Sequence, residues 1–294
     1  KMAKISPHLY GILVTAAGVL ILSPDGLLDR LIETDSATLL FWRGLLFSLG
    51  IFGFYFLRHG FGIRDTVRAM GRRGLLAAVL FCLSTIFFVL AVTHTSVANA
   101  LVIISTAPLF AALFSWLILK ESILPSTWIA IAICTGGISL IFMGSIGGGS
   151  RYGDLSAIVC AFMIAGQITT VRHARSIDMV PSLGFAGLLT AILALPFASP
   201  LAITSSDVTY LILLGLVVLP LAFGLITVGP RYISAPEVSL LMLLESIFGS
   251  LWVWLVLDEM PRPETLGGGA VVITTLIIHT AIAYHRRQRS VAAG

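Results

Sequence analysis

Charged residues are scarce in this sequence, and that scarcity excludes whole classes of protein. Asp, Glu, Lys and Arg make up 11% of the 294 residues, whereas an ordinary soluble domain has about 25%. Hydrophobic residues make up 57%, and the mean hydropathy is +1.02. A chain with so few polar groups cannot cover a water-facing surface, so we expect lipid to surround most of it. This composition argues against a soluble enzyme.

Several chemical signatures are missing as well. The three cysteines, Cys82, Cys134 and Cys160, fall inside apolar stretches, where we expect small packing residues and no disulfide. No phosphate-binding G-x-x-x-x-G-K-[ST] motif suggests ATP as a driver. No H-E-x-x-H motif or Cys/His cluster suggests a metal, and no potassium-channel filter is visible. The sequence therefore predicts neither a metal nor a cofactor.

Long apolar stretches are what the sequence has instead. About 20 apolar residues are needed to cross the hydrocarbon of a bilayer. Ten such stretches can be identified, and they leave little chain for a soluble domain. They are residues 9–24, 36–57, 75–93, 96–119, 124–144, 152–172, 181–199, 206–228, 235–257 and 264–284. The predicted fold class is therefore an all-α integral membrane protein with ten transmembrane helices.

The basic residues lie mainly on one side of this predicted membrane. Ten spans place both termini on the same side, and 14 of the 18 Lys and Arg residues lie on that side. Because cytoplasmic loops carry an excess of Lys and Arg, both termini are predicted to be cytoplasmic. The same bias accounts for the formal net charge of +4, which therefore does not indicate nucleic acid as a partner.

One loop carries much of this charge. In "RHGFGIRDTVRAMGRR", residues 58–73, Arg64, Arg68 and Arg72 recur every four residues, with apolar residues off that face. This spacing is compatible with a short helix lying on anionic lipid. A solvated loop is the alternative.

The chain contains an internal repeat. Shifted by 138 residues without a gap, residues 95–127 fall on residues 233–265, and the informative matches are Trp116 with Trp254, Glu121 with Glu259, and Pro125 with Pro263. The glycine-rich "GSIGGGS" at 144–150 is interpreted as the linker, which divides the chain into halves 1–146 and 147–294. Five spans per half is an odd number, so the second half is inverted. Inverted repeats with a site near the midplane are typical of secondary transporters.

These motifs resemble a known family. "APLFAALFSWLILKE" closes the fourth span and "LESIFGSLWVWLVLDE" closes the ninth, as in EamA-type exporters of the drug/metabolite transporter superfamily, which include amino-acid exporters of the YddG type. The matching residues are Arg43, Pro108, Glu121, Glu245 and Glu259. Ser246 stands where the family often has Pro, which weakens the case for a kink in the ninth span. The resemblance implies export of amino acids, other metabolites or drugs across a bacterial inner membrane by a monomer.

Two ionisable residues lie within predicted spans, Glu245 and Arg43. A charge at the bilayer centre costs about 2.5–3.5 kcal/mol on insertion scales, so such a group faces the bundle interior or a wet cavity. For Glu245 two interpretations remain open. It carries a proton or meets the ammonium group of a substrate, or it is a structural carboxylate held by Arg43 or by helix ends. For Arg43 the simpler expectation is a side chain that extends to the membrane surface.

The resemblance also suggests which spans wall the central cavity. In the family these are spans 1, 3 and 4 and their inverted mates 6, 8 and 9. With Arg43 of span 2, the candidate substrate-binding residues are then Thr15, Arg43, Ser84, Asn99, Ser105, Gln167, Glu245 and Trp252. Interhelical hydrogen bonding is the alternative role for Asn99 and Gln167, and packing is the alternative for Trp252.

The predicted function is export of small amphipathic metabolites, above all amino acids including aromatic ones, by alternating access. The expected partners are a small-molecule substrate, the lipid bilayer and protons as coupling ion, although facilitated transport without protons remains open. One alternative is a transporter of nucleosides, drugs or nucleotide sugars. Another is an intramembrane enzyme, for which no nucleophile and base are found at one depth.

Overall fold

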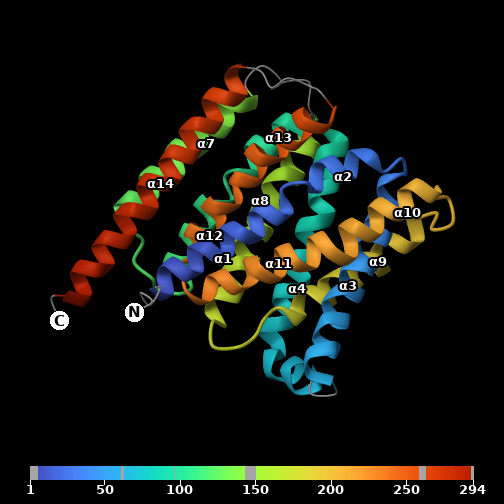
Figure 1. Cartoon of the computed structure of the whole chain (residues 1–294), viewed down its shortest axis with the longest axis horizontal. Helices are drawn as coiled ribbons and strands as arrows, with labels where there is room; N and C mark the ends of the chain where they lie inside the picture. The colour runs from blue at the N-terminus through green and yellow to red at the C-terminus, as the bar shows by residue number, and fades with distance from the viewer. Residues whose placement is uncertain (1–5, 61–62, 96, 143–149, 258–262, 293–294) are drawn as a thin grey trace.

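Helices make up every regular element that the structure describes (Figure 1). The computed structural model describes residues 6–60, 63–95, 97–142, 150–257 and 263–292. The bounds in chain order are α1 (Pro7–Leu22), α2 (Asp25–Leu31), α3 (Ser36–His59), α4 (Ile63–His94), α5 (Val97–Ile104), α6 (Ala107–Leu117), α7 (Pro125–Phe142), α8 (Arg151–His173), α9 (Pro181–Ala194), η3 (Leu195–Phe197), α10 (Ser205–Ile212), η4 (Leu213–Val218), α11 (Leu219–Val228), η5 (Gly229–Arg231), α12 (Ala235–Met242), α13 (Leu244–Leu257) and α14 (Pro263–Ala292).

Each of the ten predicted spans falls on helix. In the described residues, eight helical segments are long and apolar enough to cross a membrane. The predicted spans 124–144 and 181–199 form shorter apolar helices, Pro125–Leu140 and Pro181–Phe197. The all-helical membrane fold is therefore confirmed, whereas the count of ten spans stays a prediction.

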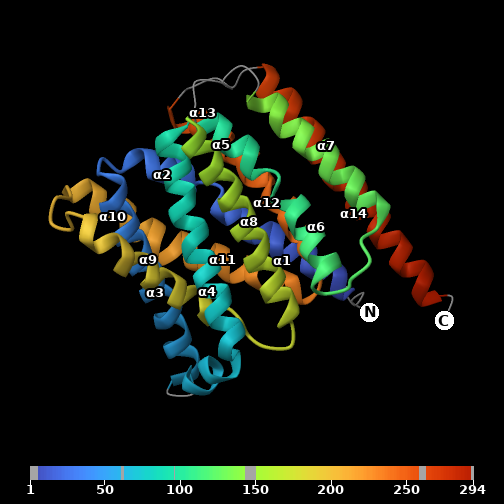
Figure 2. The same ribbon diagram turned by 180° about the vertical axis from the view of Figure 1, so that it is seen from behind.

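The most extensive helix contacts join the first half of the chain to the second. Helix α4 packs on α8 and α9, α3 on α9, α7 on α14, α1 on α11, and α6 on α8 and α12. Figure 2 shows α7 and α14 side by side at the edge of the bundle. The halves are therefore interleaved, as an inverted repeat with a shared interior requires.

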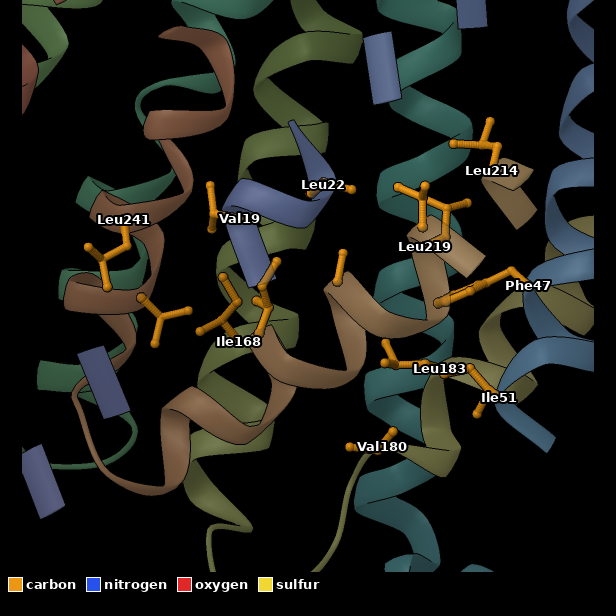
Figure 3. Packing of buried hydrophobic residues seen from close by; sticks show 14 of the residues in the cluster. Val19, Leu22, Phe47, Ile51, Ile168, Val180, Leu183, Leu214, Leu219 and Leu241 are labelled. Carbon is orange, nitrogen blue, oxygen red and sulfur yellow. The ribbon is translucent and has the colours of Figure 1, made fainter. Parts of the chain in front are cut away.

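A hydrophobic core fills the centre of the bundle (Figure 3). It takes side chains from α1, α3, α8, α9, α11 and α12, including Val19, Leu22, Phe47, Ile168, Leu183, Leu219 and Leu241. Around it, glycines let two helix pairs approach backbone to backbone. A Cβ added at Gly18 would lie 2.8 Å from the carbonyl oxygen of Ala222, and one at Gly44 would lie 2.7 Å from that of Gly187. These helix pairs, α1 with α11 and α3 with α9, are fitted too closely for a larger residue.

Two segments are interrupted at equivalent places in the repeat. Helix α5 ends at Ile104 and α6 begins at Ala107, while α12 ends at Met242 and α13 begins at Leu244. At Leu243 the backbone N–H bonds to the carbonyl of Leu240, three residues earlier, which tightens the last turn. The missing proline at position 246 therefore does not prevent a break in the ninth span, contrary to the expectation from the family pattern.

The bundle has two ends, which contain different elements. The α2 end holds α2, α10 and the last turns of α13, and the terminal end holds the start of α1 and the last turns of α14 (Figure 1). At the α2 end, Asp35 caps α3 and accepts hydrogen bonds from the N–H groups of Thr38 and Ala37, each at 3.0 Å. The hydrogen bonds from Thr38 and Ala37 hold the pKa of the Asp35 carboxyl below its ordinary value.

Part of the basic segment 58–73 forms the start of α4. This helix begins at Ile63 and bends at Gly71, where φ is +51°. Met70 is buried against the last turn of α8, whereas Arg64, Arg68 and Arg72 are exposed. The predicted helix is confirmed for the turns that carry Arg64 and Arg68, whereas Arg72 follows the bend and does not continue their face. Contact with lipid stays a prediction.

Candidate functional site

A half-buried arginine anchors a polar cluster at the α2 end. The guanidinium of Arg43, on α3, donates from Nη2 to Oδ2 of Asp25 at 2.8 Å and from Nη1 to Oδ2 of Asp29 at 2.6 Å. The two aspartates stand four residues apart on α2, so they share one face of that helix. Arg43 is therefore held by two carboxylates of α2, and the expectation that its side chain extends to the membrane surface stays a prediction.

Glu245 lies in the first turn of α13, directly after the break in the ninth span. Its carboxylate is close enough to Asp25, Asp29 and Arg43 for electrostatic interaction, yet Arg43 and Glu245 form no ion pair among the described side chains. Three carboxylates therefore lie near one guanidinium, and two of them, Asp25 and Asp29, pair with it. A cluster with excess negative charge in a membrane favours a proton or a bound cation.

Trp252 connects this cluster to the end of α1. Its Nε1 donates a hydrogen bond of 2.9 Å to Oγ of Ser23, and Ser23 Oγ donates in turn to the carbonyl of Leu20 at 2.7 Å. The predicted site residue Trp252 thus lies beside Glu245 on one helix and fastens the second half of the chain to the first.

Further polar contacts between the halves close the α2 end. Trp42 Nε1 donates to the carbonyl of Pro200 at 3.1 Å, and the N–H of Glu33 donates to Oδ1 of Asp207 at 3.0 Å. These bonds hold the α9–α10 connection over the start of α3.

Three predicted site residues use their hydroxyls locally. Thr15, Ser84 and Ser105 are buried, and each donates to a backbone carbonyl three or four residues earlier, at 2.8, 2.7 and 2.6 Å. Ser105 lies at the break between α5 and α6, whereas Thr15 packs on the backbone of Gly229. The structure therefore brings together Arg43 and Glu245, places Trp252 seven residues further along α13, and ties these three hydroxyls to their own helices.

Two predicted residues remain. Gln167 is buried in α8, the helix that packs on both α4 and α6. Asn99 belongs to α5, but its side chain lies outside the described part of the chain. Their roles in binding stay predictions.

A small cavity borders Arg43 between the two halves. Its volume is about 50 Å³, which holds a few water molecules and no metabolite. The lining includes Arg43, Phe47, Phe81, Thr85, Thr190 and Phe223. In this conformation the cavity beside Arg43 is therefore too small for a metabolite.

A larger polar cavity opens at the terminal end. Its volume is about 330 Å³, within the range of small-molecule sites. It is lined by Glu121, Ser122, Ile123, Leu124, Thr127, Arg172, Ser234 and Glu237. The α6–α7 connection, the end of α8 and the start of α12 supply these residues, so both halves contribute.

Ion pairs between the halves border this cavity. Arg172 donates to Oε1 of Glu121 from Nη2 at 2.8 Å and from Nε at 2.9 Å, and its Nη1 donates to the carbonyl of Pro230 at 2.9 Å. His8 Nε2 lies 2.9 Å from Oε1 of Glu237, whose Oε2 accepts from the backbone and hydroxyl of Ser234. These contacts join the two halves of the chain at the terminal end, beside the cavity, and we call them latches.

Sequence reasoning missed several of these residues, although readable signals existed. Asp25 and Asp29 lie outside the predicted spans, yet their spacing directly after the first span predicts one helix face. Ser234 and Glu237 form a capping box, a pattern readable as S-A-P-E, which locates the start of α12. His8 lies just before the first predicted span, and no sequence signal pairs it with Glu237.

Comparison with known proteins agrees with this architecture. A model of the EamA-like transporter family matches the chain twice, over residues 9–143 and 151–281. The pseudopaline exporter CntI of Pseudomonas aeruginosa, in strains UCBPP-PA14 and PAO1, is 26% identical over 270 residues, which cover 85% of this chain and 89% of the relative. A crystal structure at 15% identity has the same fold, with a TM-score of 0.82 over 94% of this chain and 99% of its own. The chain therefore belongs to the EamA-like transporter family, and it is an integral membrane transporter of small molecules.

Proposed function

We propose that this protein is a secondary exporter of small zwitterionic metabolites, amino acids above all. The observation that carries the proposal is the position of Glu245, at a helix break beside one arginine and two further carboxylates. Relatives named as pseudopaline exporters support export as the direction of transport.

The charge of this cluster favours a cationic group as its ligand. Asp25 and Asp29 occupy the guanidinium of Arg43, so the charge of Glu245 lacks a matched cation among the described side chains. A buried uncompensated carboxylate is costly. The ammonium group of an amino acid, or a proton, would remove that cost, which gives Glu245 a role in both binding and coupling.

The difference between the two broken segments gives the ligand an orientation. The N-terminal ends of half-helices carry partial positive charge and attract anionic substrate groups. The first turn of α6 has no acidic residue, whereas the first turn of α13 carries Glu245. A zwitterion would therefore place its carboxylate toward α6 and its ammonium toward Glu245.

The remaining parts of the proposal concern topology. Ten spans in two inverted halves, 1–146 and 147–294, would carry the solute by alternating access, in a monomer of a bacterial inner membrane. Both termini would be cytoplasmic, which makes the terminal end the side of solute entry. Cysteines introduced at the exposed positions Ser205 and Arg175 should then react with a membrane-impermeant reagent from outside and inside, respectively. Labelling of both positions from one side would contradict this topology.

Transport by purified protein in liposomes tests the function. The panel should contain aromatic and aliphatic amino acids, nucleosides, cationic drugs and pseudopaline, each measured with and without a pH gradient. We expect counterflow of amino acids, with tryptophan-sized solutes accepted. Transport of nucleosides or drugs with no transport of any amino acid would overturn the proposal. Pseudopaline is the second candidate substrate, because the 26% identical relatives are named for it.

A further inference from the structure

The cavity at the terminal end is lined by two carboxylates, and the arginine that borders it pairs with Glu121 and not with Glu237. Each nitrogen of the Arg172 guanidinium has a partner, since Nε and Nη2 donate to Glu121 and Nη1 donates to the carbonyl of Pro230. Among the described side chains, His8 is the one possible cationic partner of Glu237 within hydrogen-bond distance. In this part of the chain, the Glu237 carboxylate therefore meets an imidazole and no Lys or Arg.

His8 contacts Glu237 through one ring nitrogen. The residue is 5% exposed, and the Glu237 side chain is 11% exposed. Nε2 faces Glu237, but Nδ1 is buried and finds no partner among the described residues. In the described part of the chain, the His8 ring is therefore held by a single polar contact, and a ligand that bonds to Glu237 has only this contact to replace.

We infer that the cavity is a docking site for an ammonium-bearing solute, whose ammonium group replaces His8 as the partner of Glu237. This inference rests on the proposed function, because it takes the ligand to be the transported solute. The volume of about 330 Å³ suits a solute the size of an aromatic amino acid. Loss of the His8–Glu237 contact on docking releases α1 from α12, so ligand entry loosens a latch between the halves.

A path from this site to the centre follows one segment. Glu237 and Glu245 are eight residues apart, so they are about 12 Å apart along the helix axis. Glu237 faces the terminal cavity, and Glu245 faces the cluster around Arg43. The ninth span therefore offers an ammonium group two successive carboxylates, one at the entrance and one at the break.

Other titratable groups face His8 and have to be separated from it in any test. Glu237 of α12 and His279 of α14 interact electrostatically with each other, and His279 also interacts with His8. His279 Nε2 lies 3.0 Å from the Thr127 hydroxyl, while Glu121 and Arg172 lie across the cavity. Histidine changes charge between pH 5 and 8, so both imidazoles are candidates for a pH effect.

Equilibrium binding in lipid nanodiscs tests the inference without any need for transport. The probes are tryptamine, which carries an ammonium and no carboxylate, and indole-3-propionate, which carries the reverse. All measurements use the Glu245→Gln background, so that Glu237 is examined alone. We expect tryptamine to bind more tightly at pH 8 than at pH 6, because protonated His8 competes for Glu237. Indole-3-propionate should not compete.

Two variants in that background should shift binding in opposite directions. Glu237→Gln keeps the capping box but removes the charge, and it should weaken tryptamine binding by about tenfold or more. His8→Ala should bind at least as tightly as the parent and lose the pH dependence. Asp65→Asn, which changes an exposed acid outside the cavity, is the matched control and should change nothing.

Three outcomes would overturn the inference. They are unchanged tryptamine binding in Glu237→Gln, an unchanged pH dependence in His8→Ala, and a pH dependence that disappears in His279→Gln instead. None of them bears on the proposed role of Glu245, which is judged separately by transport in the single variant. The two ideas can therefore fail independently.

Discussion

The two ends of the bundle hold their buried charges differently. At the α2 end, Arg43 is paired with two carboxylates from its own half of the chain, Asp25 and Asp29. At the terminal end, Glu121 with Arg172 and His8 with Glu237 each join one half to the other. Pairs within one half can persist when the halves move, whereas pairs between halves have to break. The Arg43 cluster is therefore a permanent element, and the terminal pairs are latches.

The two ends also differ in the size of their cavities. About 330 Å³ is open beside the latches, against about 50 Å³ beside Arg43. The larger of these two cavities therefore lies at the terminal end. At the α2 end, hydrogen bonds such as that of Trp252 with Ser23 join the two halves.

The largest expected effect comes from removing the permanent pair. Arg43→Gln leaves two carboxylates without their cation, and breaking a buried pair from one side costs about 3–5 kcal/mol. Arg172→Gln, beside the open cavity, leaves one carboxylate that water can reach and should cost less. Thermal unfolding in detergent compares the two variants. An equal loss of stability in both would contradict the division into a permanent pair and a latch.

Glu245→Gln should affect transport more than folding. The substitution keeps size and hydrogen-bonding capacity but removes the titratable charge beside Arg43. We expect near-normal expression, transport reduced by about tenfold or more, and a flattened dependence on pH, measured by counterflow in liposomes. Glu33→Gln, an exposed acid at the same end, is the control. Normal transport by Glu245→Gln across pH, with loss of expression only in Glu245→Leu, would make the carboxylate structural.

Trp252→Phe should moderately increase how often the α2 end opens. It removes one hydrogen bond between the halves, worth about 1 kcal/mol, while it keeps an aromatic ring. A cysteine introduced at the buried position Leu27 of α2 should then react several-fold faster with a polar thiol reagent, because the α2 end opens more often. The control is Trp254→Phe, two residues along the same helix. If both substitutions accelerate labelling equally, the bond to Ser23 does not act as a closure.

The smallest effect concerns the exposed basic face of the terminal end. Replacing Arg64, Arg68 and Arg72 by Gln should leave the unfolding temperature in neutral lipid unchanged. The variant should lose the stabilisation that anionic phospholipid gives the parent, at about 1 kcal/mol or less per arginine. Arg151→Gln, an exposed arginine elsewhere, is the control. An equal response of parent and variant to anionic lipid would favour the solvated segment.

Much of the fold could be predicted from the sequence, because hydropathy reports directly which segments leave water. The repeat offset also located both segments that turn out to be broken, 95–127 and 233–265. The candidate site was predictable only in part. Thr15, Ser84 and Ser105 bond to carbonyls of their own helices, so a hydroxyl within a span is no signal of a cavity. The partners of Arg43 and Glu237 depend on helix rotation, which hydropathy does not encode.

The interleaving of the halves has a consequence for how the protein is assembled. Each half finds its packing surface only on the other, since the extensive contacts run between them and several are close glycine contacts. A fragment ending at residue 146 would expose the faces that now meet α8, α9, α11 and α12. Neither half is therefore a folding unit, and two separately made fragments would have to complement each other in opposite orientations.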